Sequence, residues 1–235
     1  MKRLSAIIVL AVATVASWGQ TKTYTLNIGD FDELTVVNSI NVSYCMDPDK
    51  AGTAVYTCSP EIASYITFTN DKDRLKIEVI TPENTLPVAG LPCVKVYSSS
   101  LEKAQNWADS TLTVENNQPA QVFKAKVIGN GNLVARNIPA TRVEGAVEAG
   151  NGHVYLQGKA RNGKFNIMSA GAIEAGDLET VKASCRVFGS GAIDCNVSED
   201  LSAFGAGSGK VYYRGTPKIK NRTVGIKLIS VDNPE

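Results

Sequence analysis

Two acidic residues, Glu174 and Asp194, are the side chains of this chain best suited to chemistry. They lie 20 residues apart, and each follows an apolar isoleucine in a segment with the alternation of a β-strand. If the two segments stack as neighbouring strands, their backbones lie about 4.8 Å apart and the carboxyl groups lie side by side. Such a pair could share a proton, bind Ca²⁺, or act as acid and base on a sugar.

A plainer interpretation is that these acids belong to a solvated surface, with Lys182 and Arg186 nearby to reduce their repulsion. Tyr155 and Tyr212 occupy the equivalent place in neighbouring repeats. Their rings could offer flat apolar surfaces to a sugar or a protein, although tyrosine is also a good strand former. The candidate ligand-binding set is therefore Glu174, Asp194, Tyr155 and Tyr212.

Two other patterns suggest chemistry but are incomplete. Residues 205–210 read GAGSGK, but a phosphate-binding loop would need glycine in place of Phe204 and serine or threonine in place of Val211. His153 is the single histidine, so a metal site with several histidines cannot form. No G-x-S-x-G sequence is present either. The sequence predicts no cofactor, no metal site and no catalytic residue.

The chain has five cysteines. Cys45 and Cys58 flank a predicted hairpin with its turn at residues 47–52, so they could form a cross-strand disulfide or remain unpaired. Cys185 and Cys195 fall on inward positions and are expected to be small core residues. Cys93 has no evident partner, and no pair has the C-x-x-C spacing of a redox or zinc site.

The elements that position these side chains are indicated by a recurring glycine turn. The second glycine of each turn returns every 18–21 residues, and an apolar residue follows it two positions later. Stacked strands lie about 4.8 Å apart, so a corner repeated in every layer needs either a positive φ or the absence of a Cβ. The predicted corner glycines are Gly131, Gly152, Gly171, Gly191 and Gly209.

This recurrence predicts an all-β fold, a parallel β-helix (solenoid) with rungs of about 20 residues. In each rung a strand runs in, the glycines turn the corner, a strand runs out and a polar loop returns. A β-sandwich would explain the alternation but not the recurring corner. The N-terminal part alternates less regularly, which favours irregular antiparallel strands leading into the solenoid. The expected division is a leader at 1–19, an N-terminal β region at 20–116, and the repeat at 117–235 with a capping strand at 224–229.

The first residues are typical of a secretory signal peptide. A basic start is followed by a mostly apolar run over residues 4–16 and by small residues, with cleavage expected between Gly19 and Gln20. The apolar run is shorter than the ~20 residues of a membrane-spanning helix. The 24 basic and 23 acidic side chains nearly balance, which argues against electrostatic binding to nucleic acid or anionic lipid.

Several segments together resemble the secreted bacterial head GIN domain family of auto-transporter adhesins. They are residues 31–36 (FDELTV), 40–42 (INV), 74–77 (RLKI), 94–97 (VKVY), 156–160 (LQGKA) and 207–217 (GSGKVYYRGTP). Ser169 departs from the pattern where other turns carry glycine. The resemblance implies a right-handed parallel β-helix outside the cytoplasm and an adhesive role, and it carries over no catalytic residue.

Two functions follow as expectations. The first is an exported, non-enzymatic binding protein of the cell envelope that contacts glycan or protein through its faces. It would reside in the periplasm, on the outer-membrane surface or outside the cell. The alternative is a polysaccharide lyase or hydrolase that uses the stacked carboxylates Glu174 and Asp194. The sequence does not define an oligomeric state.

Overall fold

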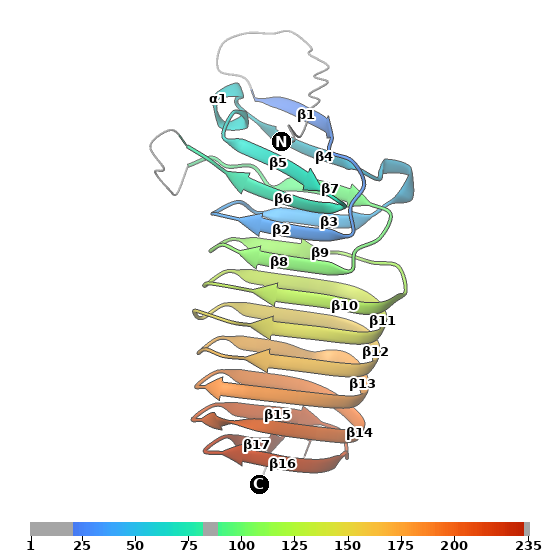
Figure 1. The fold of residues 1–235 in the computed structure, drawn as a ribbon, viewed down its shortest axis with the longest axis vertical. Helices are drawn as coiled ribbons and strands as arrows, with labels where there is room; N and C mark the ends of the chain where they lie inside the picture. The colour runs from blue at the N-terminus through green and yellow to red at the C-terminus, as the bar shows by residue number, and fades with distance from the viewer. Residues whose placement is uncertain (1–20, 82–88, 233–235) are drawn as a thin grey trace, which may run out of the picture.

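The computed structural model describes residues 21–81 and 89–232 as an elongated stack of strands (Figure 1). The N-terminal strands lie at one end of the stack and the C-terminal strands at the other. The expected leader at 1–19 and the cleavage site between Gly19 and Gln20 lie outside the described residues.

The N-terminal half contains short strands and two short helices. They are β1 (Lys22–Asn27), β2 (Glu33–Val37), β3 (Val42–Met46), a 3-10 turn (Pro48–Lys50), β4 (Thr53–Cys58), α1 (Pro60–Ala63), β5 (Ile66–Asp71), β6 (Arg74–Val79), β7 (Val94–Ser98), β8 (Lys103–Trp107) and β9 (Thr111–Val114). The C-terminal half contains longer strands. They are β10 (Ala120–Val127), β11 (Asn132–Val147), β12 (His153–Ile167), β13 (Ala172–Gly189), β14 (Ala192–Gly207), β15 (Lys210–Arg214), β16 (Lys218–Val224) and β17 (Lys227–Ser230).

Most strands pair in parallel within two sheets that face each other and enclose one core. This confirms the predicted parallel β-solenoid. The first sheet contains β7, β3, β9, the first halves of β11 to β14, then β15 and β17. The second sheet contains β6, β2, β8, β10, the second halves of β11 to β14, then β16. The pairing of β8 with β10 and of β9 with β11 carries both sheets past residue 116 without a break.

The glycine corner between the sheets uses its two glycines differently. The first glycine has a positive φ in most turns, for example 119° at Gly129 and 123° at Gly189. The second glycine packs against the preceding corner: a Cβ on Gly191 would lie 2.6 Å from the carbonyl oxygen of Gly171. The next residue continues the contact, because the Ala192 amide donates to that same carbonyl at 3.1 Å. Stacking therefore requires the absence of a side chain at the second glycine.

The opposite corner differs from the expectation of a polar return loop. β11, β12, β13 and β14 continue around it as single long strands. The turn is made by irregularities in register, such as those between Ala135 and Ile138 and between Ala175 and Glu179. Gly158 has a φ of 145° in one of these bends. The backbone therefore stays hydrogen-bonded between rungs where the sequence suggested loops.

The N-terminal strands do not stack in sequence order. β2 lies between β6 and β8 in the second sheet, and β3 lies between β7 and β9 in the first. The antiparallel strands expected here are β1 on β4, β4 on β7, and β5 on β6.

The possible Cys45–Cys58 disulfide, one of two alternatives that the sequence leaves open, does not form. β3 and β4 do not pair with each other, because β7 lies between them: Tyr97 is opposite both Cys45 and Thr53. Cys58 lies at the far end of β4, beside β1. Both thiols are free. The hairpin inferred from the turn at residues 47–52 is thus split by a strand from much later in the chain.

Buried tyrosines in the N-terminal half predict alkaline sensitivity. Burial raises the pKa of Tyr44 and of Tyr56 to about 12. A raised folded-state pKa gives stability that is complete below the unfolded value near 10 and is lost as pH rises toward 12. We expect the loss to be on the order of 2 kcal/mol per tyrosine, seen as a falling Tm above pH 10. A Tyr44→Phe, Tyr56→Phe variant should show a shallower fall, and an equally steep fall would contradict this.

The reactivity of each cysteine thiol should be lower the more deeply the thiol is buried. Cys93 is exposed, whereas Cys185 and Cys195 are buried with their Sγ atoms 3.9 Å apart. Contact with Cys195, together with burial, raises the pKa of the Cys185 thiol well above its usual range. We expect a maleimide to label Cys93 first and the two core thiols only after unfolding, as followed by peptide mass spectrometry. Equal labelling rates for Cys93, Cys185 and Cys195 in the native protein would contradict the inward placement of Cys185 and Cys195.

Candidate functional site

The candidate residues of the first sheet form one outward column across the rungs. The register places Val134 opposite Tyr155, Tyr155 opposite Glu174, Glu174 opposite Asp194, and Asp194 opposite Tyr212. Alternation along each strand directs the intervening residues, such as Ile173 and Ile193, into the core. The column therefore brings Glu174 and Asp194 onto neighbouring strands, as the spacing predicts. We call it the contact column.

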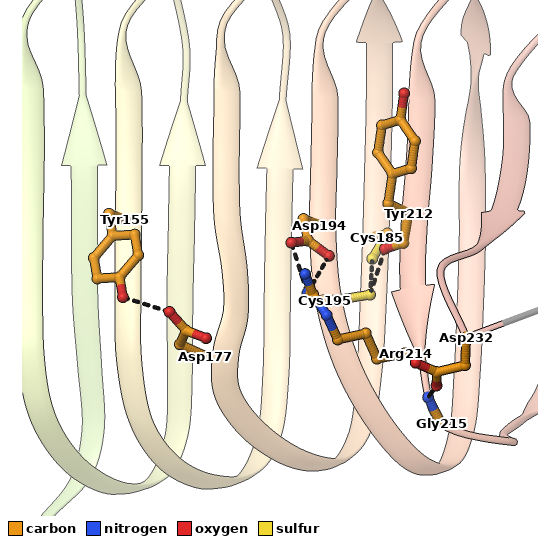
Figure 2. Close-up of polar contacts among 9 residues, drawn as sticks. All are labelled: Tyr155, Asp177, Cys185, Asp194, Cys195, Tyr212, Arg214, Gly215 and Asp232. Atoms are coloured by element: carbon orange, nitrogen blue, oxygen red, sulfur yellow. Dashed lines mark hydrogen bonds and ion pairs between the residues drawn. The ribbon is translucent and has the colours of Figure 1, made fainter.

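Asp194 is held by an arginine from the next rung. Arg214 Nη1 donates to both carboxylate oxygens of Asp194, each at 2.7 Å, as Figure 2 shows. Gly176 leaves room for this arginine, because a Cβ there would collide with Nη1. The hydrogen bond to Asp194 raises the pKa of Arg214 above its usual range. Both oxygens of Asp194 are thus already engaged.

Glu174 has a different partner. Its Oε1 lies 3.2 Å from His153 Nδ1, and both side chains are exposed. His153 begins β12 beside its corner glycine, as a turn residue would. Lys182 and Arg186, which the sequence suggested as neighbours of the acids, lie instead in the second sheet. The side-chain partners of the two acids are Arg214 and His153, which sequence spacing did not identify.

The two tyrosines are oriented differently. The Tyr155 hydroxyl donates to Asp177 Oδ2 at 2.5 Å, and this bond raises the pKa of Tyr155. Arg136 lies over the Tyr155 ring, 5.9 Å from its centroid. The Tyr212 ring points away from Asp194 and Arg214 in Figure 2. Tyr155 is therefore held at both its hydroxyl and its ring, whereas the Tyr212 ring is directed away from the pair of Asp194 and Arg214.

A depression of about 370 Å³ lies beside Tyr155, with Val134, Arg136, His153 and Glu174 among its lining residues. It offers an aromatic ring, an arginine and a carboxylate to a polar ligand. Within residues 21–81 and 89–232, no group of three or more His, Cys, Asp or Glu side chains is arranged to hold a metal ion.

A second feature, which the sequence analysis missed, is a shallow groove of about 780 Å³ on the outer surface of the second sheet. It lies between two outward columns of side chains. One column is Arg142, Asn162, Lys182, Asp200 and Lys218, and the other includes Lys164, Ser184, Ser202 and Lys220. Buried residues such as Gly163 and Ala183 lie between the columns. We call this the basic groove.

Charge in the basic groove is partly paired. Lys182 Nζ lies 2.5 Å from Asp200 Oδ2, and this hydrogen bond lowers the pKa of Asp200. Arg142 and Lys164 both approach Glu144, at 3.7 and 3.8 Å. A signal for this site was present in the sequence: Arg142, Lys182 and Lys218 recur at about twice the glycine period. Near-zero net charge concealed it, because most of the chain's acidic residues lie outside the groove.

Comparison with known proteins agrees with the fold. A family described as "Putative auto-transporter adhesin, head GIN domain" matches residues 30–217. No curated protein matches the chain. Along the described part of the chain, no helix has the length and apolar character needed to span a membrane.

Solved structures of similar shape come from Bacteroides and Parabacteroides species. A putative adhesin from Bacteroides fragilis superposes with a TM-score of 0.82 at 19% identity, covering 91% of this chain and 97% of that one. A putative lipid binding protein from Parabacteroides distasonis gives 0.70 at 22% identity, covering 90% and 97%. A putative adhesin from Parabacteroides merdae gives 0.67 at 15% identity, covering 91% and 97%. At these identities the likeness concerns the fold.

Proposed function

Because the chain belongs to the family of putative auto-transporter adhesins with a head GIN domain, we propose that it is an exported, non-enzymatic binding protein of the bacterial cell envelope. It contacts glycan or an envelope protein through the contact column, with Tyr155, Glu174, Asp194 and Tyr212 as contact residues. The family name supports an adhesive role, and the column provides the surface.

The observation that carries this proposal is the register of the first sheet. Through the column the first-sheet strands keep one register, so outward side chains from successive strands lie about 4.8 Å apart. A flat, regular surface of this kind would bind its ligand through many weak contacts spread over a large area. The exposed Glu174 and the half-buried Tyr212 offer polar and apolar contact within one column.

The geometry supports a binding role for the two acids more than a catalytic one. A sugar hydrolase needs one carboxylic acid to donate a proton and a second carboxylate to attack or to activate water. Both oxygens of Asp194 accept hydrogen bonds from Arg214, and Glu174 lies beside His153. These contacts suit a fixed polar surface.

The experiment exposes the wild-type protein to pectin and to a panel of envelope glycans and proteins, and measures both retention and ligand size. We expect retention of the protein with no shortening of any glycan. A Glu174→Gln, Asp194→Asn variant should weaken retention. Glycan cleavage that disappears in this variant would overturn the proposal in favour of an enzyme.

A further inference from the structure

We propose that the basic groove is a second binding site, distinct from the contact column, and that it binds a linear polysaccharide bearing carboxylate or sulfate groups along its length. The groove lies on the opposite sheet from the contact column. The two proposals can therefore fail separately.

The direction of the groove fits an extended polymer. Its two columns run along the stack, across the strands, over the five rungs that carry Arg142, Asn162, Lys182, Asp200 and Lys218. At about 4.8 Å per rung the outer positions lie roughly 19 Å apart. A polymer chain lying along the solenoid could contact every rung, whereas a compact small ligand would use one or two.

The charge of the groove fits an anionic ligand. Five of its lining side chains are basic (Arg142, Lys164, Lys182, Lys218 and Lys220), and Asp200 is the acidic one. Lys182 is paired with Asp200, and Arg142 and Lys164 both lie near Glu144. Lys218 and Lys220 on β16 form no ion pair with any part of the chain that the structure describes. The cations are spread over several rungs, which matches anionic groups repeated along a chain.

The shape of the groove favours a glycan over other polyanions. Ser184, Ser202 and Asn162 are short enough to keep the surface recessed, and their polar groups suit sugar hydroxyls. A flat bilayer would meet the rim but not the recessed surface. Single-stranded nucleic acid is usually held by stacking on aromatic rings, and none of the residues lining the groove is aromatic.

The test is calorimetric titration of the full chain with size-defined dextran sulfate and polygalacturonate. Neutral dextran, phosphatidylglycerol vesicles and single-stranded poly-dT serve as comparison ligands. We expect binding to the two anionic glycans that weakens with added salt, and none to neutral dextran. Lys218→Gln with Lys220→Gln should weaken glycan binding at least about tenfold, since each charge-assisted contact is lost. Arg142→Gln with Lys164→Gln, at the other end of the groove, should weaken it similarly.

The matched control is Lys210→Gln with Lys227→Gln, which removes the same charge from neighbouring strands of the first sheet. It should change affinity by less than about twofold if the site, rather than net charge, determines binding. Equal losses in the Lys218/Lys220 and Lys210/Lys227 variants would overturn the proposal. So would absence of glycan binding, or preferential binding of vesicles or poly-dT that the glycans fail to displace.

Discussion

Gly191→Ala should lower the free energy of unfolding by about 2–4 kcal/mol, although it adds a single methyl group. That methyl would lie 2.6 Å from both the Gly171 carbonyl oxygen and Ile167 Cγ2. Neither can move aside easily, because one is backbone in the adjacent corner and the other is a core side chain. The corner must open, which strains the hydrogen bond from Ala192 to Gly171. Urea denaturation followed by circular dichroism measures the effect.

Ser190→Ala is the control in the same turn. Ser190 is exposed, so its replacement should change stability by no more than about 0.5 kcal/mol. If both substitutions had equally small effects, the glycine recurrence would not be a steric requirement of stacking.

Phe165→Ala should cost about 3–5 kcal/mol. Phe165 is fully buried in β12, where it lies opposite Gly145 on β11 and opposite Cys185 on β13. Truncating it leaves a cavity between the two sheets that stacked strands cannot close without losing register. The same denaturation experiment measures this change.

Phe204→Ala provides a matched comparison, because it is the same substitution at an outward position. Phe204 is 50% exposed on the second sheet, with its ring 5.8 Å from that of Phe188. Its loss should cost less than about 1 kcal/mol. A larger loss from Phe204 than from Phe165 would mean that the strand faces are assigned the wrong way round.

The repeated half of the fold could be predicted from the sequence because its signals are local and periodic. The recurrence of Gly131, Gly152, Gly171, Gly191 and Gly209 marks one corner of every rung, and two-residue alternation defines the inward set. The second corner carries no such signal, since β13 bends there through a change in register. A change in register is determined by neighbouring strands and leaves little trace in composition.

The N-terminal half was harder to predict because its contacts join distant segments. A turn at residues 47–52 between two alternating runs is typical of a hairpin. The strand that separates those runs, β7, comes nearly 40 residues later. For this reason the hairpin inferred from that turn, and the Cys45–Cys58 pairing that it would allow, do not form.

The candidate sites show the same contrast. Glu174 and Asp194 lie side by side because they are one rung apart, so their placement could be predicted from their spacing in the sequence. The partners Arg214 and His153 depend on side-chain reach between rungs and on the space left by Gly176. Net charge is a sum over the whole chain, so it concealed a basic groove on one sheet.

The most direct test of the proposed function is a binding isotherm of the protein on immobilised bacterial envelope material, for the wild type and two paired variants. Tyr155→Ala with Tyr212→Ala removes the aromatic rings of the contact column, and Phe188→Ala with Phe204→Ala removes two exposed rings from the opposite sheet. We predict saturable binding by the wild type, at least about tenfold weaker binding by the tyrosine variant and unchanged binding by the phenylalanine variant. Binding that does not saturate, or that the tyrosine variant retains in full, would contradict the account.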